Sequence, residues 1–87
     1  MNSMLILKEK DAERVVYNYS SDVTDFDDFE APISDGEIEC FLQTKEFKTL
    51  KTATFDDDGY RAKWLRQHLL RVIFKENCPK KRFIATG

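Results

Sequence analysis

The sequence predicts a small α+β domain, in which an antiparallel sheet of four to five short strands carries one amphipathic helix on one face. Short segments rich in β-branched and aromatic residues recur along the chain, separated by turn signals. One longer segment near the C-terminus repeats its apolar residues every three or four positions, as a helix does. The connections between the expected strands are too short for parallel crossovers, except around that helix, so the strands should pair antiparallel.

Length and composition limit the organisation of the chain. Its 87 residues leave room for a single domain, 1–87, and 41% hydrophobic with 34% charged residues is typical of a globular protein. No segment approaches the roughly 20 apolar residues of a membrane span, and the N-terminal apolar run at residues 4–7 is too short for a signal-peptide core. We therefore expect a cytoplasmic protein with no membrane partner.

Five segments are candidates for the strands. Residues 4–9 alternate loosely around aliphatic side chains, residues 14–19 are dense in β-branched and aromatic residues, and residues 37–43 alternate well. Residues 47–55 contain three threonines and alternate from Phe to Phe, which favours a strand; the alternative is a second helix on a smaller sheet. Residues 82–86 are the candidate for a last short strand.

The helix is predicted at about 58–76. Asp56, Asp57 and Asp58 supply candidates for the N-cap, and Pro79 prevents the helix from continuing. One side of this helix forms an apolar stripe about 100° wide, which is the width of a core-facing side. The stripe consists of Ala62, Leu65, Leu69, Val72 and Ile73.

The charges of the chain are divided between its two parts. Residues 1–58 contain 6 Lys/Arg and 15 Asp/Glu, whereas residues 59–87 contain 8 and 1, although the whole chain has a net charge of only −2. Much of the acidic excess falls in a predicted loop at about 20–34, which also contains Phe26 and Phe29. This asymmetry is the main indication about partners that the sequence offers.

The side of the helix opposite the apolar stripe is not simply polar. At 100° per residue it collects Tyr60, Trp64, Gln67, Leu70, Arg71 and Phe74, with Lys63 and Lys75 at its flanks. A solvated helix face does not normally combine Trp, Phe, Tyr and Leu, so we expect something to cover it. Three coverings are open: the acidic loop of the same chain, a second copy of the chain, or an external ligand.

These observations lead to two functional hypotheses. The first is a non-enzymatic accessory or protein-interaction module that self-associates or binds a protein partner through Tyr60, Trp64, Arg71 and Phe74, since Trp, Tyr and Arg dominate binding hot spots. Trp64 and Phe74 would be its anchors, and Arg71 its polar contact. The alternative is nucleic-acid binding through the basic C-terminal region, comprising Lys63, Arg71, Lys75, Lys80, Lys81 and Arg82. The alternative is weaker, because the pI of about 5.4 lies well below that of typical nucleic-acid-binding domains.

No catalytic, metal, cofactor or small-molecule site is predicted. The only histidine, His68, lies at the edge of the core stripe and has no nucleophile or orienting residue at a suitable spacing. The acidic segments do not match a calcium-binding loop, and the three isolated glycines do not form a phosphate-binding loop. The cysteines are expected as reduced thiols, with Cys40 in the core and Cys78 exposed beyond the helix.

Overall fold

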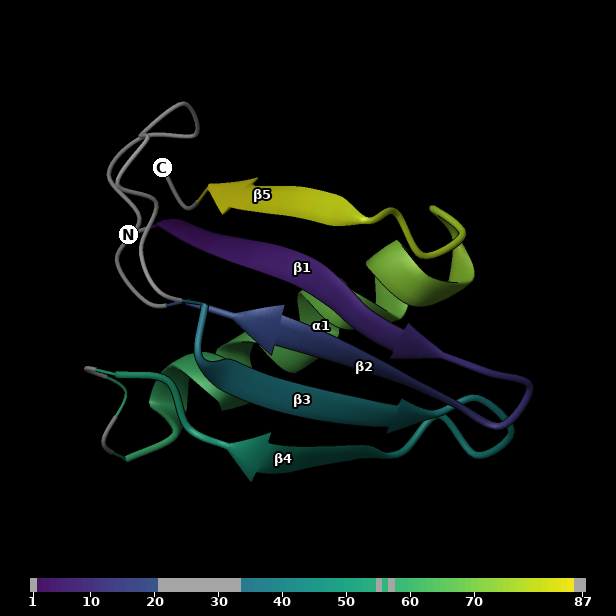
Figure 1. Cartoon of the computed structure of the whole chain (residues 1–87), viewed down its shortest axis with the longest axis horizontal. Coiled ribbons are helices and arrows are strands. Elements are labelled where there is room, and N and C mark those ends of the chain that lie inside the picture. The colour runs from purple at the N-terminus through teal and green to yellow at the C-terminus, as the bar shows by residue number, and fades with distance from the viewer. Residues whose placement is uncertain (1, 21–33, 55, 57, 86–87) are drawn as a thin grey trace.

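The computed structural model describes residues 2–20, 34–54, 56 and 58–85, and it confirms the predicted fold class (Figure 1). In these ranges a five-stranded antiparallel sheet packs against one helix. The elements in chain order are β1 (Asn2–Lys10), β2 (Arg14–Tyr19), β3 (Gly36–Phe41), β4 (Phe47–Lys51), α1 (Tyr60–Phe74) and β5 (Lys81–Ala85). The predicted acidic loop lies almost entirely outside the described residues.

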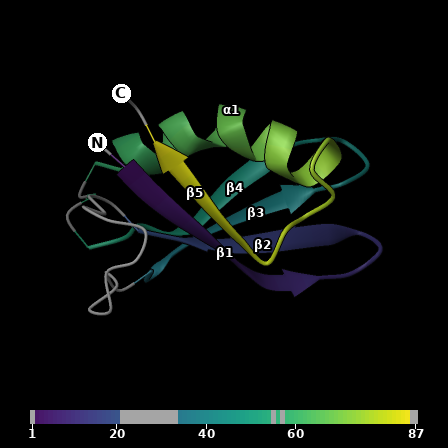
Figure 2. The ribbon, with the colours of Figure 1, turned by 90° about the horizontal axis from the view of Figure 1, so that it is seen from above.

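The strands lie in the order β4-β3-β2-β1-β5, and every neighbouring pair is antiparallel. This order makes β4 and β5 the two edge strands, and the alternation of directions makes them parallel to each other. The helix that connects them therefore has to cross from one edge to the other over one face of the sheet (Figure 2). The result is a two-layer domain, with the helix covering one face.

Strand pairing decides which side chains face the helix. Leu5 lies opposite Tyr19, and Tyr17 lies opposite Ile38, so these four side chains point to the same face. All four are buried, and they belong to the same core cluster as the helix stripe. The predicted stripe is confirmed, since each of its members is buried: Ala62, Leu65, Leu69, Val72 and Ile73.

The helix begins at Tyr60, two residues later than predicted, because Gly59 before it has a left-handed backbone (φ 71°) that a right-handed helix cannot include. Asp56 is buried and accepts hydrogen bonds from the backbone N–H groups of Arg61 (2.8 Å) and Ala62 (3.1 Å). The Tyr19 hydroxyl donates to the same carboxylate at 2.5 Å and accepts the N–H of Ala53 at 3.0 Å. A buried tyrosine thus connects the sheet to the start of the helix.

Gly36 makes room for that tyrosine. A Cβ atom at position 36 would lie 2.2 Å from the Tyr19 ring, so no other residue fits there without displacing the ring. Position 36 lies directly opposite Tyr19 in the pairing of β2 with β3. The packing of the core therefore requires glycine at this position.

The end of the helix corrects one prediction. Cys78, expected to be exposed, is buried, as is Cys40. After Phe74 the chain reverses through two residues with left-handed backbone, Asn77 (φ 61°) and Cys78 (φ 54°). The Cys78 N–H then donates to the Val72 carbonyl at 3.1 Å. This reversal folds the thiol back under the helix.

Two strands are shorter than predicted. The β3 strand ends at Phe41, and β4 ends at Lys51. Residues 52–54, the described part of the predicted continuation, are not in a strand. The register of β3 with β4 shifts between Glu37 and Ile38, and beyond it the Thr54 N–H donates to the Asp35 carboxylate at 2.9 Å. The alternative of a helix over 47–55 is wrong, because residues 47–51 pair with β3.

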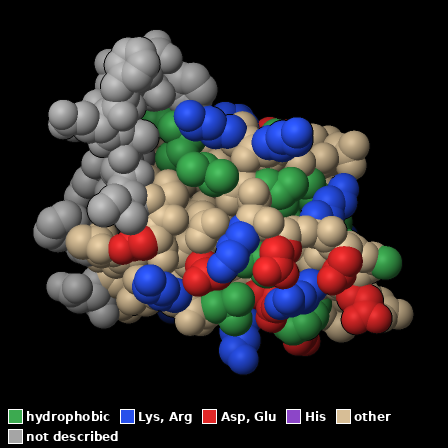
Figure 3. All heavy atoms as spheres, viewed as in Figure 1, with side chains coloured by type: hydrophobic (Ala, Val, Ile, Leu, Met, Phe, Trp, Pro, Cys, Tyr) green, Lys and Arg blue, Asp and Glu red, His purple; other side chains and the backbone are tan. Residues whose placement is uncertain are grey.

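Charged side chains of both signs gather on the face of the sheet opposite the helix, with apolar side chains between them (Figure 3). Arg14 forms ion pairs with Glu39 and, at 3.0 Å, with Glu9, while Lys8 pairs with Glu37. Positive and negative side chains alternate across the strands β1 to β3 in this arrangement. The pairing neutralises this part of the open face within the chain itself.

Candidate protein-interaction surface

The exposed side of α1 carries the apolar residues that the sequence analysis singled out, with one exception. Tyr60 is 65% exposed, Leu70 40% and Phe74 38%. Leu70 and Phe74 are four positions apart and therefore lie one above the other on the helix. The Lys45 ammonium lies over the Phe74 ring, but more than a third of each of these residues is exposed, so this side of the helix presents apolar surface to the solvent.

The exception is Trp64, which is only partly exposed and packs against the hydrophobic core. The Arg61 guanidinium lies 5.0 Å from the centre of the indole ring, and the His68 ring centre is 4.5 Å away. These three residues share the flank of the helix, since they are three and four positions apart. A large ring on that flank reaches back to the core, so Trp64 is not part of the exposed side.

Arg71, the predicted polar contact, is engaged within the chain. Its Nε donates to Glu76 at 3.2 Å, and the Arg82 Nε donates to the other oxygen of the same carboxylate at 2.8 Å. Arg82, followed by Arg71, holds the pKa of Glu76 below its usual range. One glutamate therefore balances part of the charge of two residues from the predicted basic region.

The other predicted cations remain on the surface. Lys63, Lys75, Lys80 and Lys81 all have exposed side chains. Lys63 lies in the first half of α1 and Lys75 directly follows it, whereas Lys81 begins β5 on the opposite edge of the sheet from β4. The basic residues are thus spread over several elements, and the two arginines among them share a carboxylate.

The structure reveals a second surface, where the flank of α1 meets the β4 edge. The Arg66 Nη2 donates to Thr49 Oγ1 at 3.0 Å, and the Lys45 Nζ lies 5.0 Å from the centre of the Phe74 ring. We call this surface the β4 shoulder and define it as Lys45, Phe47, Thr49, Arg66, Leu70 and Phe74. Sequence reasoning missed it, because its two halves are 17 or more positions apart along the chain.

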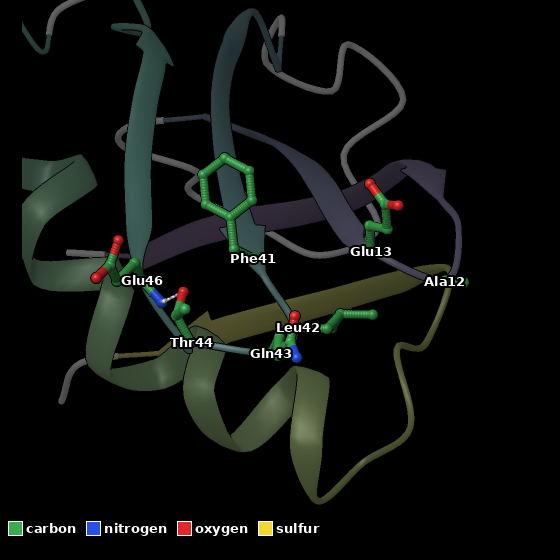
Figure 4. A pocket seen from close by; sticks show the side chains of 7 residues that line it. All are labelled: Ala12, Glu13, Phe41, Leu42, Gln43, Thr44 and Glu46. Atoms are coloured by element: carbon green, nitrogen blue, oxygen red, sulfur yellow. Dashed lines mark hydrogen bonds between the residues drawn. The ribbon is translucent and has the colours of Figure 1, made fainter.

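An open hollow of about 730 Å³ lies at the turn end of the sheet (Figure 4). Its lining comprises Ala12, Glu13, Phe41, Leu42, Gln43, Thr44 and Glu46. The side chains of Glu13, Phe41 and Glu46 point to the same side (Figure 4), and Phe41 is 39% exposed. The lining is acidic and partly apolar, but its two carboxylates are exposed and no histidine or cysteine faces them, so the hollow does not resemble a catalytic site.

The reactive side chains of the described residues occupy structural positions. Burial raises the pKa of the Cys40 thiol to about 11, so this group is protonated at neutral pH and is a poor nucleophile. Burial, with Arg71 and Arg82 nearby, lowers the pKa of His68. Within the described ranges no three His, Cys, Asp or Glu side chains are grouped closely enough to hold a metal ion.

Comparison with known proteins adds no relative: no family model matches the chain, and neither a curated protein nor a solved structure matches it. In the part of the chain that the structure describes, no helix has the length and apolar character needed to cross a membrane. The surfaces described above are therefore the basis for inferring a function.

Proposed function

We propose that this protein is a non-enzymatic protein-interaction module and that the exposed side of α1 is its binding surface. The observation that carries the proposal is the exposure of Leu70 (40%) and Phe74 (38%) one turn apart, with Tyr60 (65%) on the same side. Apolar side chains gathered on one surface of a small domain are typical of protein-binding sites. The two free cysteines are consistent with the cytoplasmic location that we also propose.

The anchors of this surface differ from those expected from the sequence. Trp64 contacts the core, so Leu70 and Phe74 take the role of apolar anchors. Arg71 contributes its exposed guanidinium edge beside Glu76, as a polar contact at the rim. Tyr60 extends the surface at the start of the helix and is the most exposed of its aromatic residues.

The charge of the helix favours a separate protein over a second copy as the partner. The sequence of α1 contains four Lys/Arg and no Asp/Glu. In a two-fold dimer the same patch meets itself, so its exposed cations, Lys63 and Arg71, would lie near those of the second copy. Like charges across an interface oppose association, whereas a partner of complementary charge does not incur this cost. Self-association is thus the second form of the proposal, and nucleic-acid binding is the weaker alternative because Arg71 and Arg82 share Glu76.

Affinity capture with surface variants tests this function. The tagged full chain, a Leu70→Ser/Phe74→Ser variant and an Ile6→Ser control, altered on the opposite face, are compared in quantitative capture from cell extract. We expect a protein that is retained by the wild type and the control and is lost with the double variant. Equal retention by all three would contradict the proposal. Sedimentation equilibrium of the same proteins tests self-association. If the chain self-associates through this surface, the wild type and the control are dimers and the double variant is a monomer.

A further inference from the structure

We infer that the β4 shoulder binds an acidic, extended segment of a partner protein, which adds to the sheet as a strand beside β4. This inference rests on the proposed function and deepens it by naming the mode of binding and the chemistry of the partner. The outer edge of β4, the apolar flank of α1 and an excess of positive charge meet at this surface.

The first element of the argument is the hydrogen-bonding capacity of the β4 edge. Strand β4 pairs only with β3 among the described residues. The Phe41 N–H donates to the Glu46 carbonyl at 2.9 Å, so this opposed pair is hydrogen-bonded, and so is the pair Glu39–Lys48 two residues further along. Phe47 lies between Glu46 and Lys48, and Thr49 follows Lys48. In the alternating antiparallel pattern these two residues direct their N–H and C=O groups away from β3. They offer a row of backbone donors and acceptors to an added strand.

The second element is the apolar wall beside that edge. Arg66, Leu70 and Phe74 recur every four positions and form one flank of α1, about 12 Å long. The Arg66–Thr49 hydrogen bond and the Lys45–Phe74 contact join this flank to the β4 side of the sheet. Leu70 lies midway between the two contacts, and Phe47 is only partly buried in the core. An added strand would therefore place alternate side chains against apolar surface.

The third element is charge, which selects the occupant. Lys45, Lys48 and Lys63 are exposed, and among the described residues none of them forms an ion pair. Arg66 donates a hydrogen bond to a neutral hydroxyl, that of Thr49. Its Nε is buried and has no hydrogen-bond partner among the described residues. The exposed carboxylate of Glu46, next to Lys45, offsets one of these four charges, and the remaining positive charge is what an acidic segment would balance.

The lysines also argue against a second copy at this edge. Two β4 strands (F-K-T-L-K) placed side by side would bring lysines together without any acidic residue of that strand to offset them. Lysine on an edge strand is a common means of preventing such self-pairing. A nucleic acid would satisfy the lysines but would leave the outward backbone groups of Phe47 and Thr49 unused. An acidic polypeptide satisfies both.

Titration of the isotope-labelled full chain tests the inference, with a nine-residue peptide that alternates glutamate and valine as the probe. We expect the amide signals of Phe47 and Thr49 to shift and their hydrogen exchange to slow, while those of β5 stay unchanged. Affinity should fall as salt is added. A peptide in which lysine replaces every glutamate serves as the matched control and should not bind.

Two substitutions at Thr49 separate backbone pairing from side-chain effects. Thr49→Val and Thr49→Pro both remove the hydroxyl that Arg66 uses, but only proline removes the outward N–H, at an edge position where proline is tolerated. We expect the proline variant to bind the peptide at least about tenfold more weakly than the valine variant. Lys48→Glu, which does not touch the core, should weaken binding by about tenfold at low salt.

Equal binding by the Val and Pro variants, or equal binding of the acidic and lysine peptides, would overturn the inference. So would an oligonucleotide that binds more tightly than the acidic peptide and shifts the amides of Lys75 and Lys80 in place of Phe47 and Thr49. If protein capture depends on Leu70 and Phe74 while the acidic peptide leaves β4 unchanged, strand addition is wrong and the proposed function stands. If protein capture does not depend on Leu70 and Phe74 and the acidic peptide also leaves β4 unchanged, both the strand addition and the proposed function are wrong.

Discussion

The two faces of the sheet are built on the same strands but are stabilised by different physics. On the helix side, Leu5, Tyr17, Tyr19 and Ile38 are buried at 1% exposure or less. On the open side, Ile6 is 37% exposed, and the charged residues of neighbouring strands pair with one another. The strand alternation that the sequence predicts sends neighbouring residues to these two environments.

The comparison shows where a side chain contributes to stability and where it is available for binding. Removing a group from the helix side leaves a cavity or an unpaired polar atom in a small core. Met4 and Val16 are buried on the open side too, but removing a partly exposed group such as Ile6 leaves a space that water can fill. Four predictions test this contrast, from the largest expected effect to the smallest.

Leu69→Ala should destabilise the fold by about 2–5 kcal/mol, because it leaves a cavity in the centre of the core. Ile6→Ala, on the open face, should cost roughly 1 kcal/mol or less, since the side chain is already partly solvated. Urea denaturation followed by circular dichroism measures both. Similar losses for the two variants would mean that the open face of the sheet is covered as effectively as the helix side.

Tyr19→Phe should destabilise the protein by about 1–3 kcal/mol, although it keeps the aromatic ring. The variant removes the donor to the Asp56 carboxylate and the acceptor for the Ala53 N–H. Both partners would then be buried with one hydrogen bond fewer. Asn18→Ala, one position along but on the open face, is the control; it removes one part-buried hydrogen bond, to the Gly36 carbonyl at 3.1 Å, and should cost less. If Tyr19→Phe is as stable as the wild type, water replaces the lost hydroxyl.

Stability should decrease as the pH rises above about 9. Burial raises the pKa of Cys40 from 9.0 to about 11, so the unfolded chain releases this proton at a lower pH than the folded chain does. Between these values the unfolded state binds fewer protons, and the free energy of unfolding falls with increasing pH. The pKa values of Tyr17 and Tyr19 are also raised by burial, with the same sign.

Denaturation midpoints near pH 8 and pH 10 measure this dependence. Cys40→Ala should show a smaller decrease between the two conditions than the wild type does. An identical decrease would assign the alkaline loss to the tyrosines alone.

Lys8→Met, which breaks an exposed ion pair with Glu37, should change stability by less than about 1 kcal/mol. Arg14→Met should cost more, because Glu39 is only 6% exposed and would lose its partner. Thermal unfolding at low and high salt compares the two. A larger effect for Lys8 would reverse the expected dependence on burial.

Much of the architecture could be predicted because it depends on local patterns. The predicted strand at 14–19 agrees with β2, and the apolar stripe of the helix identified its buried side residue by residue. Boundaries were less accurate where a distant group decides them. The helix starts only at Tyr60, after the left-handed Gly59, and its first turn is held by Asp56, which Tyr19 contacts from 37 positions away along the chain.

The candidate site was predicted only in part, for the same reason. Tyr60, Leu70 and Phe74 are exposed as the helical spacing indicates. Trp64 is only partly exposed, because its large ring on the helix flank reaches the core. Arg71 and Arg82 were assigned to one basic region, but they converge on Glu76. Helical periodicity describes the direction of a side chain and not the neighbours it meets.

The amino-acid sequence by itself determined the fold class, the antiparallel pairing, the core side of the helix and the division of charge, since propensity and periodicity act over a few neighbouring residues. Only the tertiary structure decided that Cys78 is buried, that Gly36 lies against Tyr19 and that the flank of α1 meets the edge of β4. These features depend on contacts between residues far apart in the chain, which form only when the sheet and the helix pack together.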